Sequence, residues 1–268
     1  LTPQQMTNTY LVRNLAPLFD YYVNDAFGAA HRASPSMVAF QEVLPTVAGR
    51  LLMAEIDALA AVADSPQRPC IYLLGGLKIS DAFGMLGKVL GDGTADEVLT
   101  AGVTGQVFLL AQGRKLGEAS EKFIRERNLW GFVDEAKAQL AAHTAKIRLP
   151  LDFAVEAGGE RVEIGVEDLP TEHLILDIGS RTIAAYAEAI ARAATVFVNG
   201  PPGAYENPNT QAGTRQLWQA LAETPAHTVI GGGDTVTSAK RFIDTDRIDV
   251  VSTGGGALIR YLSGKPLP

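Results

Sequence analysis

Three glycine-rich turns lie in the last third of this chain, each directly after a short apolar run. They are Asn199-Gly-Pro-Pro-Gly203, Gly231-Gly-Gly-Asp-Thr235 and Ser252-Thr-Gly-Gly-Gly256. A strand that ends in glycines and leads into a helix exposes backbone N–H groups to an anion at the positive end of the helix dipole. Open parallel sheets bind ligands along the carboxyl edge of their strands. The turns therefore predict a phosphate-bearing ligand at one sheet edge.

From Pro69 onward, apolar strands alternate with helical stretches, which is typical of a parallel sheet covered on both faces. The predicted strands are Cys70–Leu74, Glu97–Ala101, Ile147–Val155, Leu174–Leu176, Thr195–Val198, Thr228–Ile230 and Ile248–Val251. The predicted helices between them include Ala119–Asn128, Arg181–Ala194 and Thr214–Ala222. The polar segment Glu156–Glu167 predicts a surface hairpin. The expected fold class is α/β, a Rossmann-like parallel sheet flanked by helices.

The first part of the chain is less regular. We expect a helix over Pro3–Leu15 and a strand over Leu18–Val23. From Thr46 to Val62, directly after Pro45, apolar residues recur with the helical period and predict one long helix. The polar, proline-rich segment Asp64–Pro69 follows it, and we expect the helix to connect two lobes there.

Composition excludes several classes of protein. A chain of 268 residues that is 47% hydrophobic can bury one large core or two unequal lobes. A net charge of −7 argues against a nucleic-acid surface, which needs a basic face. The single cysteine, Cys70, is predicted to be a core thiol and fits a reducing compartment. No apolar run approaches the about 20 residues of a membrane span. We expect a soluble, cytoplasmic protein that binds neither nucleic acid nor membrane.

Common catalytic motifs are missing from the sequence. Gly87-Lys88 is followed by Val89 and Gly264-Lys265 by Pro266, so neither pair ends a Walker-type phosphate loop. The four histidines lack metal-ligand spacing, and no Gly-x-Ser-x-Gly elbow occurs. Walker-type phosphate binding is therefore excluded, and the sequence disfavours zinc-dependent and serine-hydrolase chemistry.

Four side chains are candidates to meet the ligand, and each has an ordinary alternative. Lys78 follows a strand end, where its ammonium group can reach a phosphate, or it is a solvated surface lysine. Asp234 is either a helix N-cap or a carboxylate that addresses Mg²⁺ beside a phosphate. Glu206 is either an exposed loop carboxylate or an acceptor for ribose hydroxyls. Arg32 is either an ordinary basic loop residue or a residue that captures an anion, because a guanidinium group forks onto phosphate or carboxylate.

Seven segments, in order, resemble phosphoglycerate kinase. They are Tyr22-Val-Asn-Asp-Ala-Phe-Gly-Ala-Ala-His-Arg32, Leu74-Gly-Gly-Leu-Lys78, Leu149-Pro-Leu-Asp-Phe153, Leu176-Asp-Ile-Gly179, Asn199-Gly-Pro-Pro-Gly203, Gly231-Gly-Gly-Asp-Thr235 and Ser252-Thr-Gly-Gly-Gly-Ala257. The resemblance implies two lobes, each with a Rossmann-like sheet, joined by a long helix. It divides the chain into a remnant of the substrate-binding lobe (1–45), an inter-lobe hinge helix (46–63) and a nucleotide-binding lobe (64–268).

The resemblance also implies a reaction, a cofactor and site residues. The reaction is Mg²⁺-dependent phosphoryl transfer between 1,3-bisphosphoglycerate and ADP, giving 3-phosphoglycerate and ATP in glycolysis, by an enzyme that is a monomer when intact. By motif position, Arg32 holds the glycerate and Asp234 serves the metal. The implied catalytic residues are Lys78, Gly232, Gly233, Gly254 and Gly255. The implied nucleotide-binding residues are Gly75, Gly76, Lys78, Gly102, Asn199, Pro201, Gly203, Ala204, Glu206, Gly232, Gly233, Asp234 and Thr235.

The chain departs from the family pattern in several places. Ala82 stands where most members carry a second lysine, and Val198 replaces a tryptophan. The segment Ala101–Gly105 replaces a Gly-Gly-Gly-Met turn, so the adenine contacts are open. The first part of the N-terminal lobe and the C-terminal tail have no counterpart here. We therefore expect a truncated chain with little activity alone.

Two further functions are alternatives to the kinase. A nicotinamide-dependent oxidoreductase requires Gly-x-Gly-x-x-Gly after its first strand, and Gly75-Gly-Leu-Lys-Ile-Ser80 does not fit. A non-catalytic nucleotide-binding module derived from the kinase lobe stays open, because Ala82 removes an expected cation and part of the substrate lobe is missing.

Overall fold

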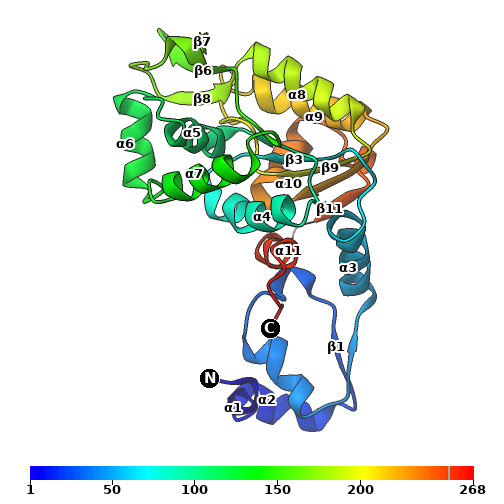
Figure 1. Ribbon diagram of the computed structural model, residues 1–268. Helices are drawn as coiled ribbons and strands as arrows, with labels where there is room; N and C mark the ends of the chain where they lie inside the picture. The colour runs from blue at the N-terminus through cyan, green and yellow to red at the C-terminus, as the bar shows by residue number, and fades with distance from the viewer. Residues whose placement is uncertain (253) are drawn as a thin grey trace.

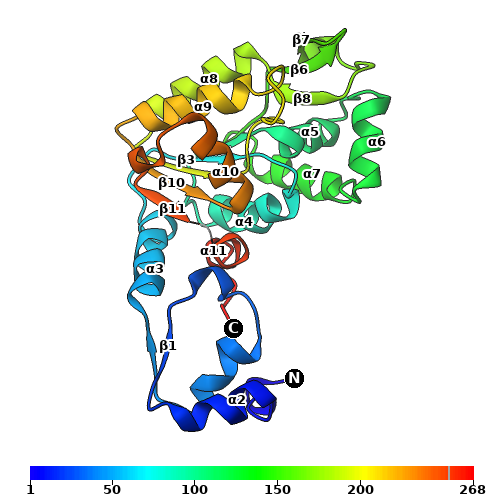
Figure 2. The same cartoon turned by 180° about the vertical axis from the view of Figure 1, so that it is seen from behind.

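The computed structural model describes residues 1–252 and 254–268, so Thr253 of the third glycine-rich turn lies outside the described residues. A large lobe surrounds one sheet, a slender N-terminal segment lies below it, and helix α3 (Arg50–Ala63) runs between them (Figure 1). The same arrangement is seen from behind, where the last helix, α11 (Gly255–Leu262), lies between the sheet and the N-terminal segment (Figure 2).

The remaining elements follow in chain order. The other α-helices are α1 (Pro3–Met6), α2 (Tyr10–Leu15), α4 (Ile79–Gly91), α5 (Gly102–Ala111), α6 (Glu118–Glu126), α7 (Phe132–His143), α8 (Ser180–Arg192), α9 (Ala212–Glu223) and α10 (Gly233–Phe242). The short 3-10 and π turns are η1 (Ala16–Leu18), η2 (Phe27–Ala29), η3 (Pro35–Ala39), η4 (Phe40–Glu42), η5 (Val166–Asp168) and η6 (Thr245–Arg247). The strands are β1 (Tyr22–Asn24), β2 (Thr46–Ala48), β3 (Cys70–Leu74), β4 (Glu97–Thr100), β5 (Ile147–Arg148), β6 (Asp152–Ala157), β7 (Glu160–Gly165), β8 (Ile175–Ile178), β9 (Thr195–Asn199), β10 (His227–Gly231) and β11 (Val250–Ser252).

The central sheet of the described chain has six strands in the order β11-β10-β9-β3-β4-β5, and every neighbouring pair is parallel. All residues of β3 and β9 are buried. Continuous apolar strands of this kind need helices on both faces of the sheet. The expected α/β class with a parallel sheet is confirmed.

Successive side chains of β3 point to opposite faces of the sheet and join two separate cores. Cys70, Tyr72 and Leu74 pack with residues of α4, α5, α7 and α11. Ile71 and Leu73 pack with residues of α8, α9 and α10. Cys70 is fully buried, and burial together with the nearby Asp96 carboxylate raises the pKa of its thiol to about 12. The predicted core thiol is confirmed.

A second, antiparallel sheet in the order β7-β6-β8 projects from the large lobe. Its hairpin turns at Gly158 and Gly159, which adopt positive φ values of 62° and 83° that favour glycine. The predicted surface hairpin is therefore present. The predicted strand Ile147–Val155 is wrong, because β5 and β6 belong to different sheets. The N–H groups of Leu151 and Asp152 donate to Thr182 Oγ1 at 2.9 and 3.1 Å, outside the central ladder.

The other predicted elements of the large lobe are found with small shifts at their ends. The predicted helices correspond to α6, α8 and α9. The last two predicted strands correspond to β10 and β11, and β8 begins one residue later than predicted. Shifts of this size are normal, because helix and strand ends depend on local capping.

The predicted helix Pro3–Leu15 is wrong as one helix. It divides into α1 and α2, because Thr7 and Thr9 donate their hydroxyl groups to the carbonyls of Gln4 and Met6 at 2.7 and 2.8 Å, in competition with the helical ladder. The predicted strand Leu18–Val23 is also too long, since only the end of this region forms β1.

The predicted helix Thr46–Val62 begins later than expected. Residues Thr46–Ala48 form β2, which pairs in parallel with β1, and α3 starts at Arg50. Asp25 Oδ1 accepts the N–H of Leu52 at 2.9 Å and so caps the first turn of α3. The unit 46–63 is therefore a strand followed by a helix. No helix in the described part of the chain combines the length and the hydropathy of a membrane span.

Candidate functional site

The glycine-rich turns meet at the carboxyl edge of the central sheet, as predicted. The turns follow β3, β9, β10 and β11, and Gly102 follows β4, so five neighbouring strands end at this edge. The turns line one cleft, whose lining residues are Gly75, Gly76, Leu77, Lys78, Asp81, Asn199, Gly200, Pro201, Gly232, Gly233, Asp234, Thr235, Gly255 and Gly256.

The turns bind one another through their backbones. Gly75 and Gly76 donate their N–H groups to the carbonyls of Asn199 and Pro201 at 2.9 and 2.8 Å. A Cβ atom on Gly75 would lie 2.7 Å from the carbonyl oxygen of Pro201, and Gly200 adopts a φ of 85°. Glycine is required here because two turns pack closely. This packing fixes the position of Lys78, which follows directly.

Some turn N–H groups predicted to meet phosphate are already engaged inside the protein. Gly232 donates to Ser252 O, and Gly254 donates to Ser252 Oγ, both at 3.2 Å. The first residues of α10 and α11 also line the cleft, and the first N–H groups of a helix have no intrahelical partner. In α10, Val236 is the first to donate along the helix, at 3.0 Å to Gly232 O. A Cβ atom on Gly233 would meet no atom within 4 Å, so the backbone at the start of α10 is open to a ligand.

Lys78 and Asp234 face each other across the cleft. Lys78 Nζ lies 3.0 Å from Asp234 Oδ2, and both side chains are about two-thirds exposed. Asp81, in the first turn of α4, also lines the cleft. Burial raises the pKa of the Asp81 carboxyl group, Lys78 lowers it and Asp234 raises it. The cleft thus holds one ammonium group and two carboxyl groups, so a polyphosphate needs a further cation to bind beside them.

The residues at the cleft fit a magnesium ion carried by a phosphate ligand. In residues 1–252 and 254–268, no group of three or more His, Cys, Asp or Glu side chains is arranged to hold a metal ion. Mg²⁺ is commonly bound through one or two carboxylates, substrate phosphates and water. The exposed Asp234 carboxylate at the N-terminus of α10 is a group of this kind.

A second hollow joins the cleft and shares Gly76, Leu77, Pro201 and Asp234 with it. Its walls come from α5, α6, β8 and the loop after β9. The other lining residues are Gly102, Val103, Gln106, Phe123, Arg127, Leu174, Ile175, Leu176, Gly203, Ala204, Tyr205 and Glu206. The structure therefore brings the predicted residues Gly102, Gly203, Ala204 and Glu206 to one pocket beside the cleft.

Sequence reasoning missed Phe123, Arg127, Gln106 and Tyr205 in this pocket. The Arg127 guanidinium lies 3.6 Å from the centroid of the Phe123 ring, and together they form the wall on the α6 side. Their spacing of four residues on a predicted helix was the available signal. It did not identify a pocket, because α6 reaches the sheet edge only through the tertiary fold.

Arg32 lies outside both hollows but beside the cleft. Its Nε donates to His31 Nε2 at 3.4 Å. A Cβ atom on Gly256, a residue of the cleft, would lie 2.8 Å from His31 Cδ2. Position 82, where the resemblance led us to expect a second lysine, is a fully buried alanine of α4 and offers the cleft no charge.

Comparison with known proteins agrees with this geometry. The family model described as phosphoglycerate kinase matches residues 2–265. The phosphoglycerate kinase of Halobacterium salinarum is 46% identical over 268 residues, which cover 99% of this chain and 67% of that protein. The enzyme of the same name from Methanothermobacter thermautotrophicus is 41% identical over 99% of this chain and 64% of its own length.

Solved structures give the same result. The crystal structure of phosphoglycerate kinase from Pyrococcus horikoshii OT3 superposes with a TM-score of 0.92 at 38% identity, over 99% of this chain and 66% of that chain. The structure of the Coxiella burnetii enzyme gives 0.86 at 32% identity, over 98% of this chain and 67% of that one. This chain thus spans about two thirds of the length of these relatives. On sequence and on structure alike, it belongs to the phosphoglycerate kinase family.

Proposed function

We propose that this chain binds Mg·ADP or Mg·ATP at the joined hollows and serves the phosphoglycerate kinase reaction, the transfer of a phosphoryl group between 1,3-bisphosphoglycerate and ADP. Membership of the family supports the reaction. The observation that carries the proposal is the Lys78–Asp234 pair: both residues line the phosphate cleft, and Asp234 also lines the second hollow. A nucleoside diphosphate consists of a polyphosphate, which suits the cleft, and a base with its ribose, which suits the second hollow.

The reaction does not require a general acid or a general base. The P–O bond to the acyl group breaks as one forms to the terminal phosphate oxygen of ADP, and this asks mainly for positioning and charge neutralisation. The Lys78 ammonium and the N–H groups at the starts of α10 and α11, including those of Gly233 and Gly255, stabilise charge on the transferred group. Bound Mg²⁺ would neutralise phosphate oxygens, with Asp234 as its protein ligand. Glu206 accepts hydrogen bonds from the ribose hydroxyls.

The substrate side of the site rests on fewer residues. Arg32 stands next to His31, which contacts the start of α11, so its guanidinium is suited to the glycerate carboxylate or phosphate. In this proposal residues 1–45 belong to the substrate-binding side, α3 within 46–63 is the hinge and 64–268 is the nucleotide lobe. A single, buried cysteine and a net charge of −7 support a cytoplasmic, monomeric enzyme.

Calorimetric titration of the chain with ADP, with and without Mg²⁺, tests the proposal. We expect saturable binding of Mg·ADP and no binding of NADH, used as a control. Lys78→Ala and Asp234→Ala should each raise the Kd for Mg·ADP about tenfold or more, because each removes a charged partner of the phosphates or of the metal. Asp234→Ala should leave binding of metal-free ADP unchanged or tighter, because it removes a repulsive carboxylate. A folded chain that binds no Mg·ADP would overturn the assignment.

A further inference from the structure

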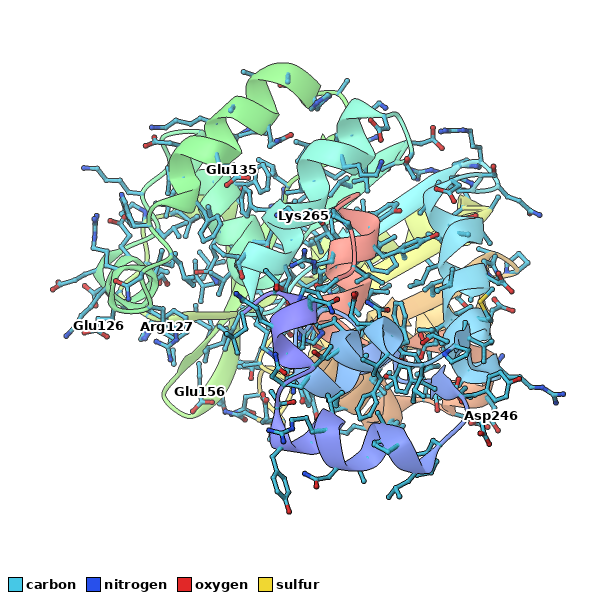
Figure 3. All side chains as sticks on the ribbon, turned by 90° about the horizontal axis from the view of Figure 1, so that it is seen from below. Glu126, Arg127, Glu135, Glu156, Asp246 and Lys265 are labelled. Carbon is cyan, nitrogen blue, oxygen red and sulfur yellow. The ribbon has the colours of Figure 1, made fainter. Side chains whose placement is uncertain are left out.

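The β6–β7 hairpin holds the loop from Ala204 to Gln211 in place. This loop carries Tyr205 and Glu206. Three side chains of the loop and the hairpin connect them directly. Asn207 Nδ2 donates to Glu156 Oε2 at 2.6 Å, and Asn209 Nδ2 donates to the carbonyl of Gly159 at 2.8 Å. Glu156 and Gly159 belong to the hairpin, and Glu156 lies on the same side of the molecule as the pocket residue Arg127 in Figure 3.

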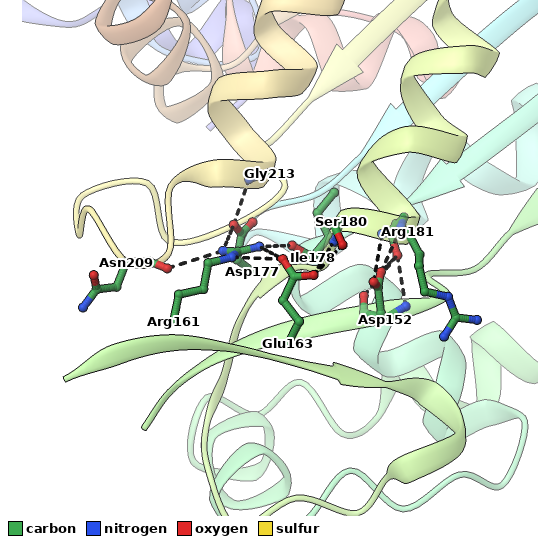
Figure 4. Close-up of polar contacts among 10 residues, drawn as sticks. Asp152, Arg161, Glu163, Asp177, Ile178, Ser180, Arg181, Asn209 and Gly213 are labelled. Atoms are coloured by element: carbon green, nitrogen blue, oxygen red, sulfur yellow. Dashed lines mark hydrogen bonds and ion pairs between the residues drawn. The ribbon is translucent and has the colours of Figure 1, made fainter. Parts of the chain in front are cut away.

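Arg161 of β7 extends the connection into the lobe, as Figure 4 shows. Its Nη1 donates to Asp177 Oδ2 at 2.8 Å and to the carbonyl of Asn209 at 3.4 Å. Its Nη2 donates to the carbonyl of Ile178 at 2.8 Å and to Glu163 at 3.0 Å. The guanidinium thus joins the hairpin, strand β8 and the loop at one point.

Asp177 holds both ends of the loop in place. Its side chain is fully buried, and Oδ2 also accepts the N–H of Gly213, at the start of α9, at 2.8 Å. A Cβ atom on Gly203 would lie 2.0 Å from Asp177 Oδ1, so the residue just before the loop packs on the same carboxylate. The adjoining Leu176, which lines the second hollow, accepts the N–H of Ala204 at 2.8 Å.

We propose that the β6–β7 hairpin, through Arg161 and Asp177, positions the 204–211 loop for the base and ribose of the nucleotide. Arg161 and Asp177 are positioning residues, since neither lines the two hollows. The inference rests on the proposed function and adds a specific cause of nucleotide affinity. The hairpin acts on the base and ribose end, because its own contacts lie on Asn207 and Asn209. Gly203, which packs on Asp177, lines the second hollow and not the phosphate cleft.

Two variants separate the hairpin from the loop. Asn209→Ala removes the contact with Gly159 without leaving a buried charge. The double variant Arg161→Met/Asp177→Asn removes the ion pair as a unit, which avoids the large cost of one unpaired buried charge. Arg181→Met is the matched control, because Arg181 also pairs with a carboxylate next to the hairpin, Glu167 at 2.6 Å, but does not contact the loop.

Hydrogen exchange of the ligand-free protein and titrations with Mg·ADP and with Mg·pyrophosphate test the proposal. We expect both variants to speed amide exchange within 204–211. If the loop then holds its bound geometry about one tenth of the time, the Kd for Mg·ADP rises about tenfold, whereas that for Mg·pyrophosphate changes less than about twofold. Arg181→Met should change neither Kd, and Lys78→Ala should raise both.

The outcomes distinguish this inference from the proposed function. Equal Mg·ADP affinities in the parent chain and in both variants would overturn the hairpin's role while leaving the nucleotide site intact. The same loss for Mg·pyrophosphate as for Mg·ADP would also overturn it, because a general loss of structure would then explain both. A parent chain that binds neither ligand would overturn the proposed function and this inference together.

Discussion

The ring of Phe27 lies directly against Gly254, where a Cβ atom would be 2.6 Å from Phe27 Cε1. Phe27 is 2% exposed although it belongs to the slender N-terminal segment. Gly254 stands immediately before α11, which begins at the edge of the phosphate cleft. This contact therefore attaches the N-terminal segment, including Arg32, to the large lobe.

Phe27→Ala is expected to release the N-terminal segment and leave the lobe folded. Removal of a buried phenyl group typically costs about 3–5 kcal/mol. Here this loss weakens the attachment of the segment to the lobe. Limited proteolysis should cut residues 1–48 faster, whereas amide protection of β3 and β9 stays the same. Phe19→Ala is the control, since Phe19 belongs to the same segment and is 59% exposed. Equal cleavage of the two variants would contradict the prediction.

Gly233→Ala and Gly102→Ala should separate binding from folding. A methyl group on Gly233 enters open space at the cleft, so Mg·ADP affinity should fall with little change in stability. Gly102 has a φ of 53°, and a Cβ atom there would lie 2.8 Å from Gly76 N. That variant should lose about 1–3 kcal/mol of unfolding free energy from strain and overpacking. Thermal unfolding and calorimetry of both variants give the comparison.

Arg127→Ala should weaken binding of adenine nucleotides by a few-fold. A loss of this size corresponds to about one exposed cation–π contact together with the packing of the arginine side chain. The matched control is Arg125→Ala, because Arg125 lies 3.3 Å from the centroid of the Trp130 ring, and neither residue lines the second hollow. Calorimetric titration with Mg·ADP measures both. If Arg125→Ala lost as much affinity, the effect would be due to α6 stability and not to the pocket.

The buried Asp177 predicts an unusual pH dependence of stability. Burial raises the pKa of Asp177 to about 6, against hydrogen bonds from Gly213 and Arg161 that lower it. Between the ordinary pKa of 3.8 and about 6, the folded protein binds this proton more tightly than the unfolded chain does. The contribution of Asp177 to the unfolding free energy therefore falls as the pH rises through that window.

Asp177→Asn removes that contribution, so denaturant unfolding from pH 4 to pH 7 measures it as a difference between two curves. The stability of the parent relative to Asp177→Asn should decline as the pH rises to about 6 and then level off. The difference is needed because Glu163 has the opposite shift: burial raises its pKa, but hydrogen bonds from Ser180 and Arg161 leave it below the ordinary value. A constant difference across this range would refute the assignment.

Local sequence patterns predicted the elements that form from residues close together in the chain. The apolar run Cys70–Leu74 and the glycines after it identify a buried parallel strand and its turn without any tertiary information. The same reasoning failed at Thr46–Ala48, where pairing with Tyr22–Asn24 overrides a helical pattern. It also failed to separate β5 from β6, since the N–H groups of Leu151 and Asp152 donate to Thr182, a residue far along the chain.

The residues of the candidate site also divide into those that local sequence patterns predict and those that they do not. Lys78 and Asp234 were predicted because each adjoins a glycine-rich turn, and the structure brings them to 3.0 Å. Phe123 and Arg127 had no comparable signal, since they enter the second hollow from a charged surface helix. The engagement of the Gly232 and Gly254 N–H groups was also beyond sequence reasoning, because their acceptor, Ser252, is supplied by β11.

The burial of Cys70 gives this protein an internal reporter of its own opening. The thiol is the single one in the chain, it is fully buried at the start of β3, and its pKa of about 12 leaves almost no thiolate at neutral pH. A thiol reagent can therefore react only after the centre of the sheet separates from its helices, so the labelling rate counts such openings. Because a ligand that binds only the folded protein makes openings rarer, added Mg·ADP should slow labelling in proportion to its occupancy. Nucleotide binding becomes readable from one sulfur atom that never touches the nucleotide.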